Sequence, residues 1–169
     1  MRITRRTALG TLLAGGGLLA IGLFGSYLLR GMMNGRMMGS ASSTDLSTYT
    51  DLFNRHTELR RNVEEIPGGV RTTTESDAPD LVAQLQAHVS SMYGHVNQRA
   101  EVTCMSDSLP TLFRNASGYH RQLTFTSNGV TVAETSSDQA VTSAIRAHAQ
   151  EVSGFVRDGM PAMMRGMMG

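Results

Sequence analysis

Two histidines at equivalent positions are the residues of this chain best suited to bind a cofactor. Each lies on the apolar stripe of a predicted amphipathic helix, His88 on the helix near 79–97 and His148 on the helix near 138–157. Imidazole is a ligand for Cu, Zn, Fe and Ni, and two imidazoles can supply both axial ligands of a haem. We therefore predict that His88 and His148 bind a cofactor, with copper preferred and non-covalent haem b as the alternative.

The other histidines fit such a site to different degrees. His56 lies beside apolar residues of a predicted short helix, and His120 precedes a predicted hairpin, so both are candidate further metal ligands. His95 aligns with Phe155 and is left out of the site. The competing interpretation is a core role, because a histidine on an apolar stripe commonly satisfies its nitrogens with neighbouring groups. Two equivalent histidines argue against that, since burying imidazole twice costs desolvation twice.

Nine of the 12 methionines lie in two short clusters, one near each end of the chain. Thioether sulfur selects Cu(I) and survives in an oxidising compartment. Neighbouring glycines and Pro161 favour flexible arms over helices. Packing against a partner or a membrane interface is the alternative, because methionine is an adaptable hydrophobe. The candidate metal ligands are His56, His88, His120, His148, Met32, Met33, Met37, Met38, Met160, Met163, Met164, Met167 and Met168, with Cys104 and Met105 in reserve.

Composition excludes several other classes of function. The single cysteine rules out an internal disulfide, zinc sites built from CxxC pairs and a covalently attached haem. The 15 basic residues, all arginine, nearly balance the 14 acidic ones, so no broad positive field attracts nucleic acid. No GxSxG, HExxH, P-loop or dinucleotide-binding motif occurs. We therefore predict a binding protein and not an enzyme.

An uncharged stretch from Thr7 to Leu29 follows the N-terminal arginines. It is long enough to span a membrane as a helix, and the run around Arg5-Arg6 is similar to a twin-arginine export signal. By the positive-inside rule the rest of the chain lies outside the cytoplasm, in the periplasm or on the cell surface. We predict a signal or anchor helix over 1–30, membrane contact through 8–29 and a methionine-rich linker over 31–44.

The exported part contains an internal repeat. When the chain is aligned with itself so that Arg61 meets Arg121, 61–97 matches 121–157 without a gap. Identical pairs begin at Arg61, Gly69, Val70, Ser76, Ala87, His88, Gly94 and Val96. The predicted domain covers 45–158, with repeats near 45–100 and 105–158, and a methionine-rich tail over 159–169.

Each repeat is expected to contain a short helix, a hairpin and a long helix. The short helices are predicted near 45–60 and 108–117. Turns at Pro67-Gly68-Gly69 and Ser127-Asn128-Gly129 predict the hairpins, the second through an Asn-Gly turn. The expected fold is α+β: a duplicated αββα unit forming a four-stranded antiparallel sheet whose apolar face is covered by helices.

The C-terminal half carries a resemblance to a group of uncharacterised exported bacterial proteins. It rests on Gly129-Val130-Thr131-Val132-Ala133-Glu134-Thr135-Ser136, on Ile145-Arg146-Ala147-His148-Ala149 and on Val152-Ser153-Gly154-Phe155-Val156 to Gly159-Met160. The resemblance runs from about Leu52 to Met160 and implies export and the same fold. It also implies recurrent histidines at His56, His88 and His148, whereas Asn115, Ala116 and Cys104-Met105 depart from the group's pattern.

These observations together predict a membrane-tethered extracytoplasmic metal-binding protein that binds or handles copper. A protein that transfers metal or electrons is its expected partner. A b-type haem protein with two histidine ligands is the first alternative, and a tethered interaction or sensor module without a cofactor is the second.

Overall fold

The computed structural model describes residues 40–102 and 106–159. The predicted anchor segment, both methionine clusters, Cys104 and Met105 lie outside these residues. Within the two described ranges, no helix is both long enough and apolar enough to cross a membrane.

Four antiparallel strands form one sheet in the order β1-β2-β4-β3. The strands are β1 (Leu59–Ile66), β2 (Gly69–Ser76), β3 (His120–Thr126) and β4 (Gly129–Thr135). Strands β1 and β2 form one hairpin and β3 and β4 the other, and β2 pairs with β4 in the middle. The predicted α+β class with a four-stranded antiparallel sheet is confirmed.

The pairing of the strands follows the repeat that aligns the sequence with itself. Arg60 lies opposite Glu75 in the first hairpin, and His120 lies opposite Thr135 in the second. At the centre of the sheet Thr72 lies opposite Val132, and the repeat aligns these same two residues with each other. The two hairpins are therefore related by a twofold axis through this central pair.

The hairpin turns are shorter than predicted. The loops consist of two residues each, and Gly69 and Gly129 are the first residues of β2 and β4. A Cβ at Gly129 would lie 2.0 Å from the carbonyl oxygen of Thr74, and one at Gly69 would lie 1.8 Å from that of Glu134. The predicted Asn-Gly turn is wrong, because glycine is required at 129 by the close approach of β2 and β4 and not by the turn.

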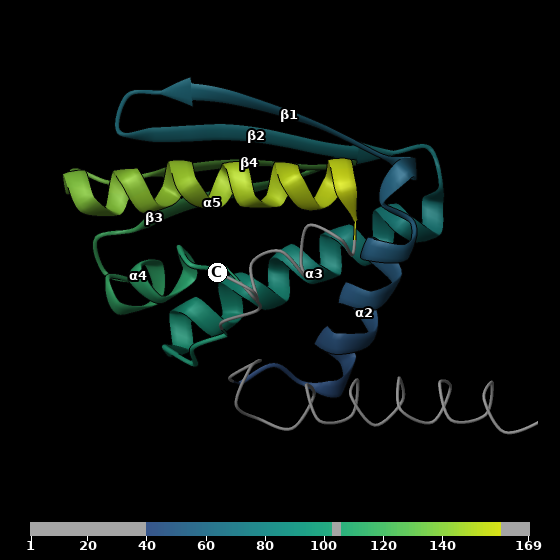
Figure 1. The fold of residues 1–169 in the computed structure, drawn as a ribbon, viewed down its shortest axis with the longest axis horizontal. Coiled ribbons are helices and arrows are strands. Elements are labelled where there is room, and N and C mark those ends of the chain that lie inside the picture. The colour runs from purple at the N-terminus through teal and green to yellow at the C-terminus, as the bar shows by residue number, and fades with distance from the viewer. Residues whose placement is uncertain (1–39, 103–105, 160–169) are drawn as a thin grey trace, which may run out of the picture. The chain divides into compact units, whose positions relative to one another are not determined.

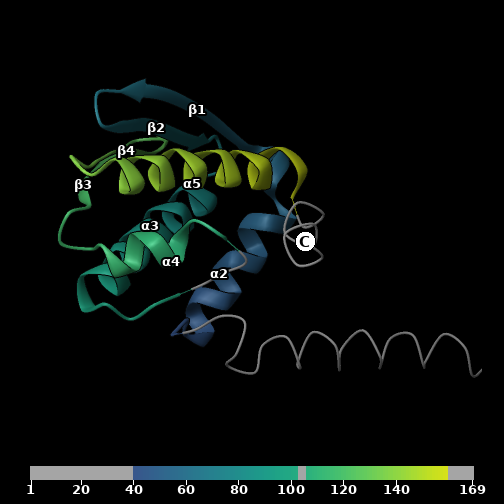
Figure 2. The same cartoon turned by 60° about the vertical axis from the view of Figure 1, so that its left-hand side comes forward.

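In the described part of the chain four α-helices lie on one side of the sheet (Figures 1 and 2). The predicted helix over 45–60 ends early: a 3-10 turn covers His56–Glu58, and Leu59 already pairs with Ser76 in the sheet. The other predicted helices are present with small shifts at their ends. The helices are α2 (Ser43–Asn54), α3 (Pro79–Gln98), α4 (Leu109–Arg114) and α5 (Gln139–Asp158).

Two helix starts have side-chain caps. At α2, Ser42 and Asp45 form a capping box, in which each side chain accepts a hydrogen bond from the other residue's backbone N–H. The carboxylate of Asp138 caps the start of α5.

The core lies between the sheet and the long helices α3 and α5. Val70, Leu81, Val141 and Ile145 are almost completely buried there. The inner face of the sheet is less apolar than predicted, because its buried positions include Thr72, Thr74 and Glu134. Buried polar groups need hydrogen-bond partners, so this face is organised by specific contacts as well as by packing.

Candidate functional site

His88 on α3 has a buried ring nitrogen that lacks a hydrogen-bond partner. Within the described residues, its Nδ1 makes no hydrogen bond. Desolvation is the main cause that lowers the pKa of His88 to about 4. The Asp45 carboxylate acts in the opposite direction and raises this pKa, whereas the charge of His148 lowers it further. His88 is therefore neutral at pH 7, which is the form that binds metals. A buried nitrogen without a partner costs about 1–3 kcal/mol, so its presence calls for an explanation.

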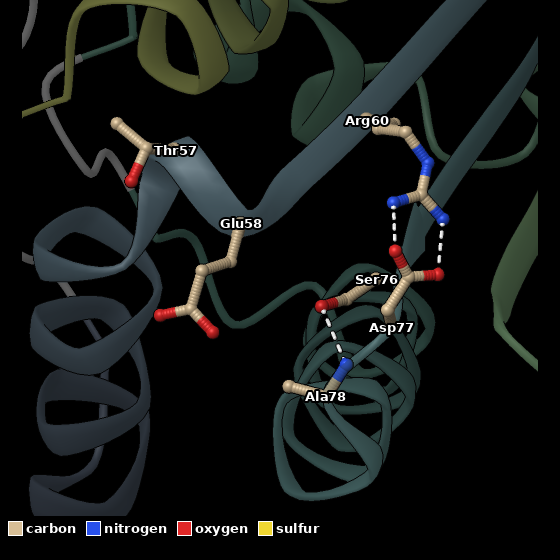
Figure 3. A pocket seen from close by; sticks show the side chains of 6 residues that line it. All are labelled: Thr57, Glu58, Arg60, Ser76, Asp77 and Ala78. Carbon is tan, nitrogen blue, oxygen red and sulfur yellow. Dashed lines mark hydrogen bonds and ion pairs between the residues drawn. The ribbon is translucent and has the colours of Figure 1, made fainter.

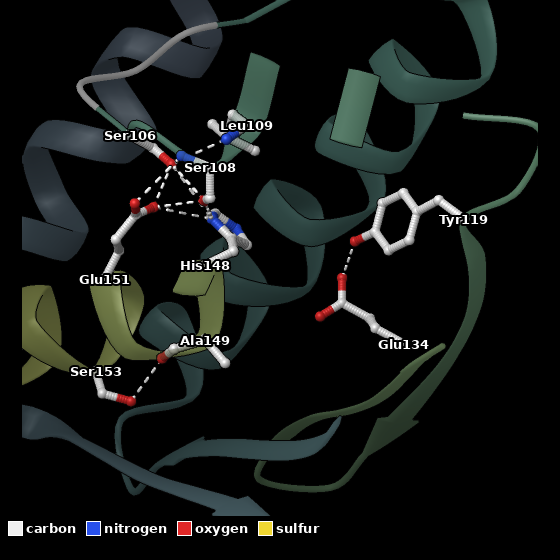
Figure 4. Close-up of polar contacts among 9 residues, drawn as sticks. All are labelled: Ser106, Ser108, Leu109, Tyr119, Glu134, His148, Ala149, Glu151 and Ser153. Atoms are coloured by element: carbon white, nitrogen blue, oxygen red, sulfur yellow. Dashed lines mark hydrogen bonds and ion pairs between the residues drawn. The ribbon is translucent and has the colours of Figure 1, made fainter. Parts of the chain in front are cut away.

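His148 lies on α5, and its Nδ1 faces the segment that leads into α4 (Figure 4). This nitrogen lies 3.2 Å from the hydroxyl oxygen of Ser108 and 3.5 Å from a carboxylate oxygen of Glu151. Burial alone would raise the pKa of Glu151, but hydrogen bonds from His148, Ser106 and Ser108 lower it to about 2. An ionised carboxylate beside Nδ1 favours the tautomer with its proton there, which leaves the lone pair on Nε2.

The two histidines occupy related places in the fold. They lie at positions that the repeat aligns, one on each of the two long helices, and the charge of His148 lowers the pKa of His88. In metal sites a ligating histidine commonly donates its other N–H to a carboxylate or a similar acceptor, and Nδ1 of His148 faces such groups on Glu151 and Ser108.

The serines beside His148 do not form a nucleophilic triad. In such a triad the hydroxyl contacts one imidazole nitrogen and the carboxylate contacts the other. Here the hydroxyls of Ser106 and Ser108 and the carboxylate of Glu151 all lie on the Nδ1 side. Both hydroxyls donate to Glu151, and the backbone N–H of Ser108 donates to its other oxygen at 3.2 Å. Glu151 therefore orients His148 and the start of α4 and does not activate a serine.

A methionine and a tyrosine lie next to His88. The rings of Tyr49 and His88 meet edge to face with centroids 4.7 Å apart. The hydroxyl of Tyr49 donates a hydrogen bond to Sδ of Met92 at 2.8 Å. Met92 follows His88 by one helical turn on α3, so the two side chains share a face. A thioether and an imidazole thus both flank Tyr49.

A third histidine, His95, takes part in a polar network that the sequence did not reveal. Its Nε2 lies 3.1 Å from a carboxylate oxygen of Asp45, which is only 5% exposed. The hydroxyl of Ser91 donates to the other oxygen at 2.6 Å. Burial would raise the pKa of Asp45, but hydrogen bonds from Ser91, Ser42 and His95 hold it well below its usual range. This network joins α2 to α3 and places a negative charge near His88.

His56 and His120 do not join the pair. Nδ1 of His56 lies 2.9 Å from the carbonyl oxygen of Val156, and its ring fills the space beside Gly159. Val156 is eight residues after His148, or about 12 Å along the helix axis. His120 is exposed at the first position of the edge strand β3. Among the predicted histidine ligands, only His88 and His148 lie at equivalent positions of the two long helices, and the predicted methionine ligands lie outside the described residues.

A second polar cluster lies on the inner face of the sheet around Glu134. The hydroxyls of Tyr93 and Tyr119 both donate to the same carboxylate oxygen of Glu134, Tyr93 at 2.9 Å. Desolvation and the adjacent carboxylate raise the pKa of both tyrosines well above their usual range. The guanidinium of Arg121 lies over both rings. These contacts explain how the carboxylate of Glu134 can be buried. The alternation of buried positions along β4 is the sequence signal that could have predicted that Glu134 faces the core.

A polar pocket of about 340 Å³ lies at the start of α3, away from both histidines (Figure 3). Arg60 and Asp77 form a bidentate ion pair in it, with N–O distances of 2.7 and 2.8 Å. The hydroxyl of Ser76 accepts from the backbone N–H of Ala78. Glu58 pairs with Arg55 outside the pocket, and none of these contacts points to a ligand.

Within residues 40–102 and 106–159, no three side chains from His, Cys, Asp and Glu are arranged to hold a metal ion. No protein-family model, curated protein or solved structure matches this chain.

Proposed function

We propose that this protein is a membrane-tethered, extracytoplasmic copper-binding protein. His88 and His148 bind the ion in the folded domain, and the two methionine clusters capture it or pass it on. The N-terminal segment over 1–30 exports the domain and anchors it, so that the domain works outside the cytoplasm. A duplicated αββα unit accounts for the recurrence of histidine at the same position of both long helices.

One observation carries this proposal: two imidazoles lie at equivalent positions of the two long helices, and each has a nitrogen free of protein partners in the described part of the chain. Nδ1 of His88 is buried and unpaired, and Nδ1 of His148 is held by Glu151 and Ser108 so that Nε2 is left over. A histidine pair with one desolvated member and one carboxylate-oriented member is an arrangement suited to a soft or borderline cation.

Charge also supports a cation in this place. The Asp45 carboxylate attracts positive charge at His88, and the Glu151 carboxylate contacts His148. Both carboxylates are ionised at pH 7, because their hydrogen bonds lower their pKa values. A bound Cu⁺ would be balanced by these charges without requiring either carboxylate as a ligand.

The test is a metal and haem titration of the full chain in detergent, for the wild type and for His88→Leu and His148→Leu. We expect about one tightly bound copper in the folded domain, lost in both variants. His120→Leu is the matched control, because His120 is exposed on an edge strand, and it should bind as the wild type does. The nine clustered methionines are replaced by leucine in all forms, so that only the domain is measured.

Two other outcomes would replace the proposal. A Soret band that appears on adding haem and disappears in both variants would make this a b-type haem protein. Unchanged copper binding in both variants would remove the histidine pair from the site. If neither copper nor haem binds, a tethered interaction or sensor module becomes the preferred function.

A further inference from the structure

Arg61 is a half-buried arginine whose positive charge has no carboxylate partner. It lies on β1 opposite the buried Thr74 of β2, so it shares the inner face of the sheet, and its Nη1 donates to the Thr74 hydroxyl at 2.7 Å. Its Nε is fully buried and makes no hydrogen bond within residues 40–102 and 106–159. All 14 acidic residues of the chain lie in these ranges, and none of them forms an ion pair with Arg61.

A desolvated charge without a counter-ion is unfavourable, and Arg61 shows this cost. Desolvation lowers the pKa of Arg61 to about 10, although the Glu134 carboxylate and Tyr93 act in the opposite direction. The hydrogen bonds that Glu134 accepts come from Tyr93 and Tyr119 and not from Arg61. A water molecule would satisfy the free N–H of Nε but would not supply a negative charge, whereas an anion would do both.

The unused edge of this guanidinium is the edge that binds carboxylates elsewhere in the protein. Nε and Nη2 of an arginine form a fork of two N–H donors that matches two carboxylate oxygens. The fork of Arg55 binds both oxygens of Glu58 at 2.9 and 2.8 Å, and the fork of Arg157 binds both oxygens of Asp158 at the same distances. In Arg61 neither Nε nor Nη2 has a hydrogen-bond partner in the described part of the chain. Only Nε is fully buried, so a ligand can enter from the side of Nη2.

The repeat supplies an internal comparison, because it aligns Arg61 with Arg121. Arg121 lies on β3 opposite Glu134 and also lacks an ion pair among the described residues. Its two terminal nitrogens, however, donate to the carbonyl oxygen of Tyr119 at 2.9 Å and to the side chain of Asn97 at 2.8 Å, and its guanidinium lies over two tyrosine rings. The fold therefore provides partners for Arg121, whereas it provides Arg61 with a single hydroxyl.

We propose that Arg61 is the anchor of a second binding site, which takes the carboxylate of a small organic acid. The two carboxylate oxygens accept hydrogen bonds from Nε and Nη2, while the Thr74 hydroxyl holds Nη1 in place. A monoanion fits better than phosphate, because one guanidinium faces the ligand and the Glu134 carboxylate acts on the same guanidinium and repels further negative charge. The site does not depend on the proposed copper function, since neither His88 nor His148 takes part in it.

The experiment is thermal unfolding of the full chain in detergent at pH 7 with increasing concentrations of sodium acetate. Sodium chloride keeps the ionic strength constant, and sodium phosphate is titrated in a parallel series. A ligand that binds only the folded state raises the melting temperature as its concentration increases, and the dissociation constant follows from that increase. We expect acetate to raise the melting temperature of the wild type more than phosphate does.

Two variants separate binding at the fork from general effects of the salt. Arg61→Met removes both the charge and the fork, and Arg61→Lys keeps the charge but lacks the fork. In both variants the dissociation constant of acetate should increase by about tenfold or more, because hydrogen bonds to charged groups are the strong ones. Arg71→Met is the matched control, because it removes an exposed arginine of the neighbouring strand that pairs with Glu64, and it should respond to acetate as the wild type does.

Three results would overturn the site or its ligand. An acetate effect of equal size in the wild type and in both Arg61 variants would show that no acetate binds at the fork. A phosphate effect that exceeds that of acetate and is lost in the variants would overturn the assignment to a carboxylate. If Arg61→Met does not fold, the NMR signals of the arginine Nε–H groups decide: acetate should shift one signal of the wild type that is missing in Arg61→Lys, and an unshifted signal would exclude the site.

Discussion

Replacing Glu151 with glutamine should destabilise the domain by an amount that depends on pH. The side chain of Glu151 is 24% exposed, and its pKa is lowered from 4.5 to about 2 by hydrogen bonds from His148, Ser106 and Ser108, which outweigh desolvation. A difference of that size corresponds to about 3 kcal/mol of folding free energy. Glutamine keeps one acceptor oxygen but has no charge, so we expect a loss of about 2–3 kcal/mol at pH 7.

The direction of the pH dependence follows from the lowered pKa. The stabilising contribution of Glu151 is complete above pH 4.5, its pKa in the unfolded chain, and disappears as the pH falls towards about 2. The difference in unfolding free energy between the wild type and Glu151→Gln should therefore be largest at neutral pH and small near pH 2. Asp45 also has a lowered pKa, but it is present in both proteins, so its contribution cancels in the difference.

The assay is urea unfolding of a form that starts at residue 40, followed by circular dichroism at several pH values. At pH 7 the midpoint of the variant should fall by roughly 1–2 M urea. Glu65→Gln is the matched control, because Glu65 is an exposed carboxylate in a surface ion pair and should cost little. A loss in Glu151→Gln that is the same at pH 7 and near pH 2 would refute the charge-based reasoning and leave only a packing role.

Three further predictions concern His88, the central strands and the anchor. His88→Leu should leave the unfolding free energy of the metal-free domain at pH 7 unchanged or raised. Between pH 6.5 and about 4 the unfolding free energy of the wild type should fall, because His88 is neutral in the folded protein and charged in the unfolded chain. In His88→Leu this decrease should be smaller. An NMR titration of the His88 ring that gives a pKa near 6.5 would contradict this. Gly69→Ala should destabilise the domain by more than about 2 kcal/mol in the same urea assay, because its Cβ would lie 1.8 Å from a carbonyl oxygen of the neighbouring strand. Gly94→Ala serves as the control, because a Cβ at this position meets no atom within 4 Å. The segment up to Leu29 should remain attached in cells, and a soluble mature form that begins near Ser42 would exclude the anchor.

The repeat was the most informative feature of the sequence, because the structure uses it in its backbone. The internal alignment placed His88 and His148 at equivalent points of two helices, and the strand pairing has the same offset around Thr72 and Val132. Other parts of the repeat were predicted less well. Leu59 and Arg60 read as the end of a helix but pair with β2, since strand pairing satisfies their backbone groups better than a frayed helix end would.

The partners of the histidines could not be read from the sequence. Glu151 lies three residues after His148 and was therefore a visible helical neighbour, but its link to Ser106 and Ser108 depends on how the segment before α4 folds against α5. Asp45 and His95 are 50 residues apart and meet only because α2 packs on α3. Met92 follows His88 by four residues in the sequence, whereas the orientation of its sulfur depends on Tyr49 from another helix.

The sequence by itself determined the element types, the antiparallel hairpins, the repeat and the recurrence of histidine, because periodicity and turn residues are local properties of the chain. Only the tertiary structure decided which side chains surround each histidine, that His56 and His120 lie apart from the pair, and that His88 is desolvated with one nitrogen unpaired. These properties arise from contacts between segments far apart in the chain. Burial and pKa depend on those contacts, and no local pattern encodes them.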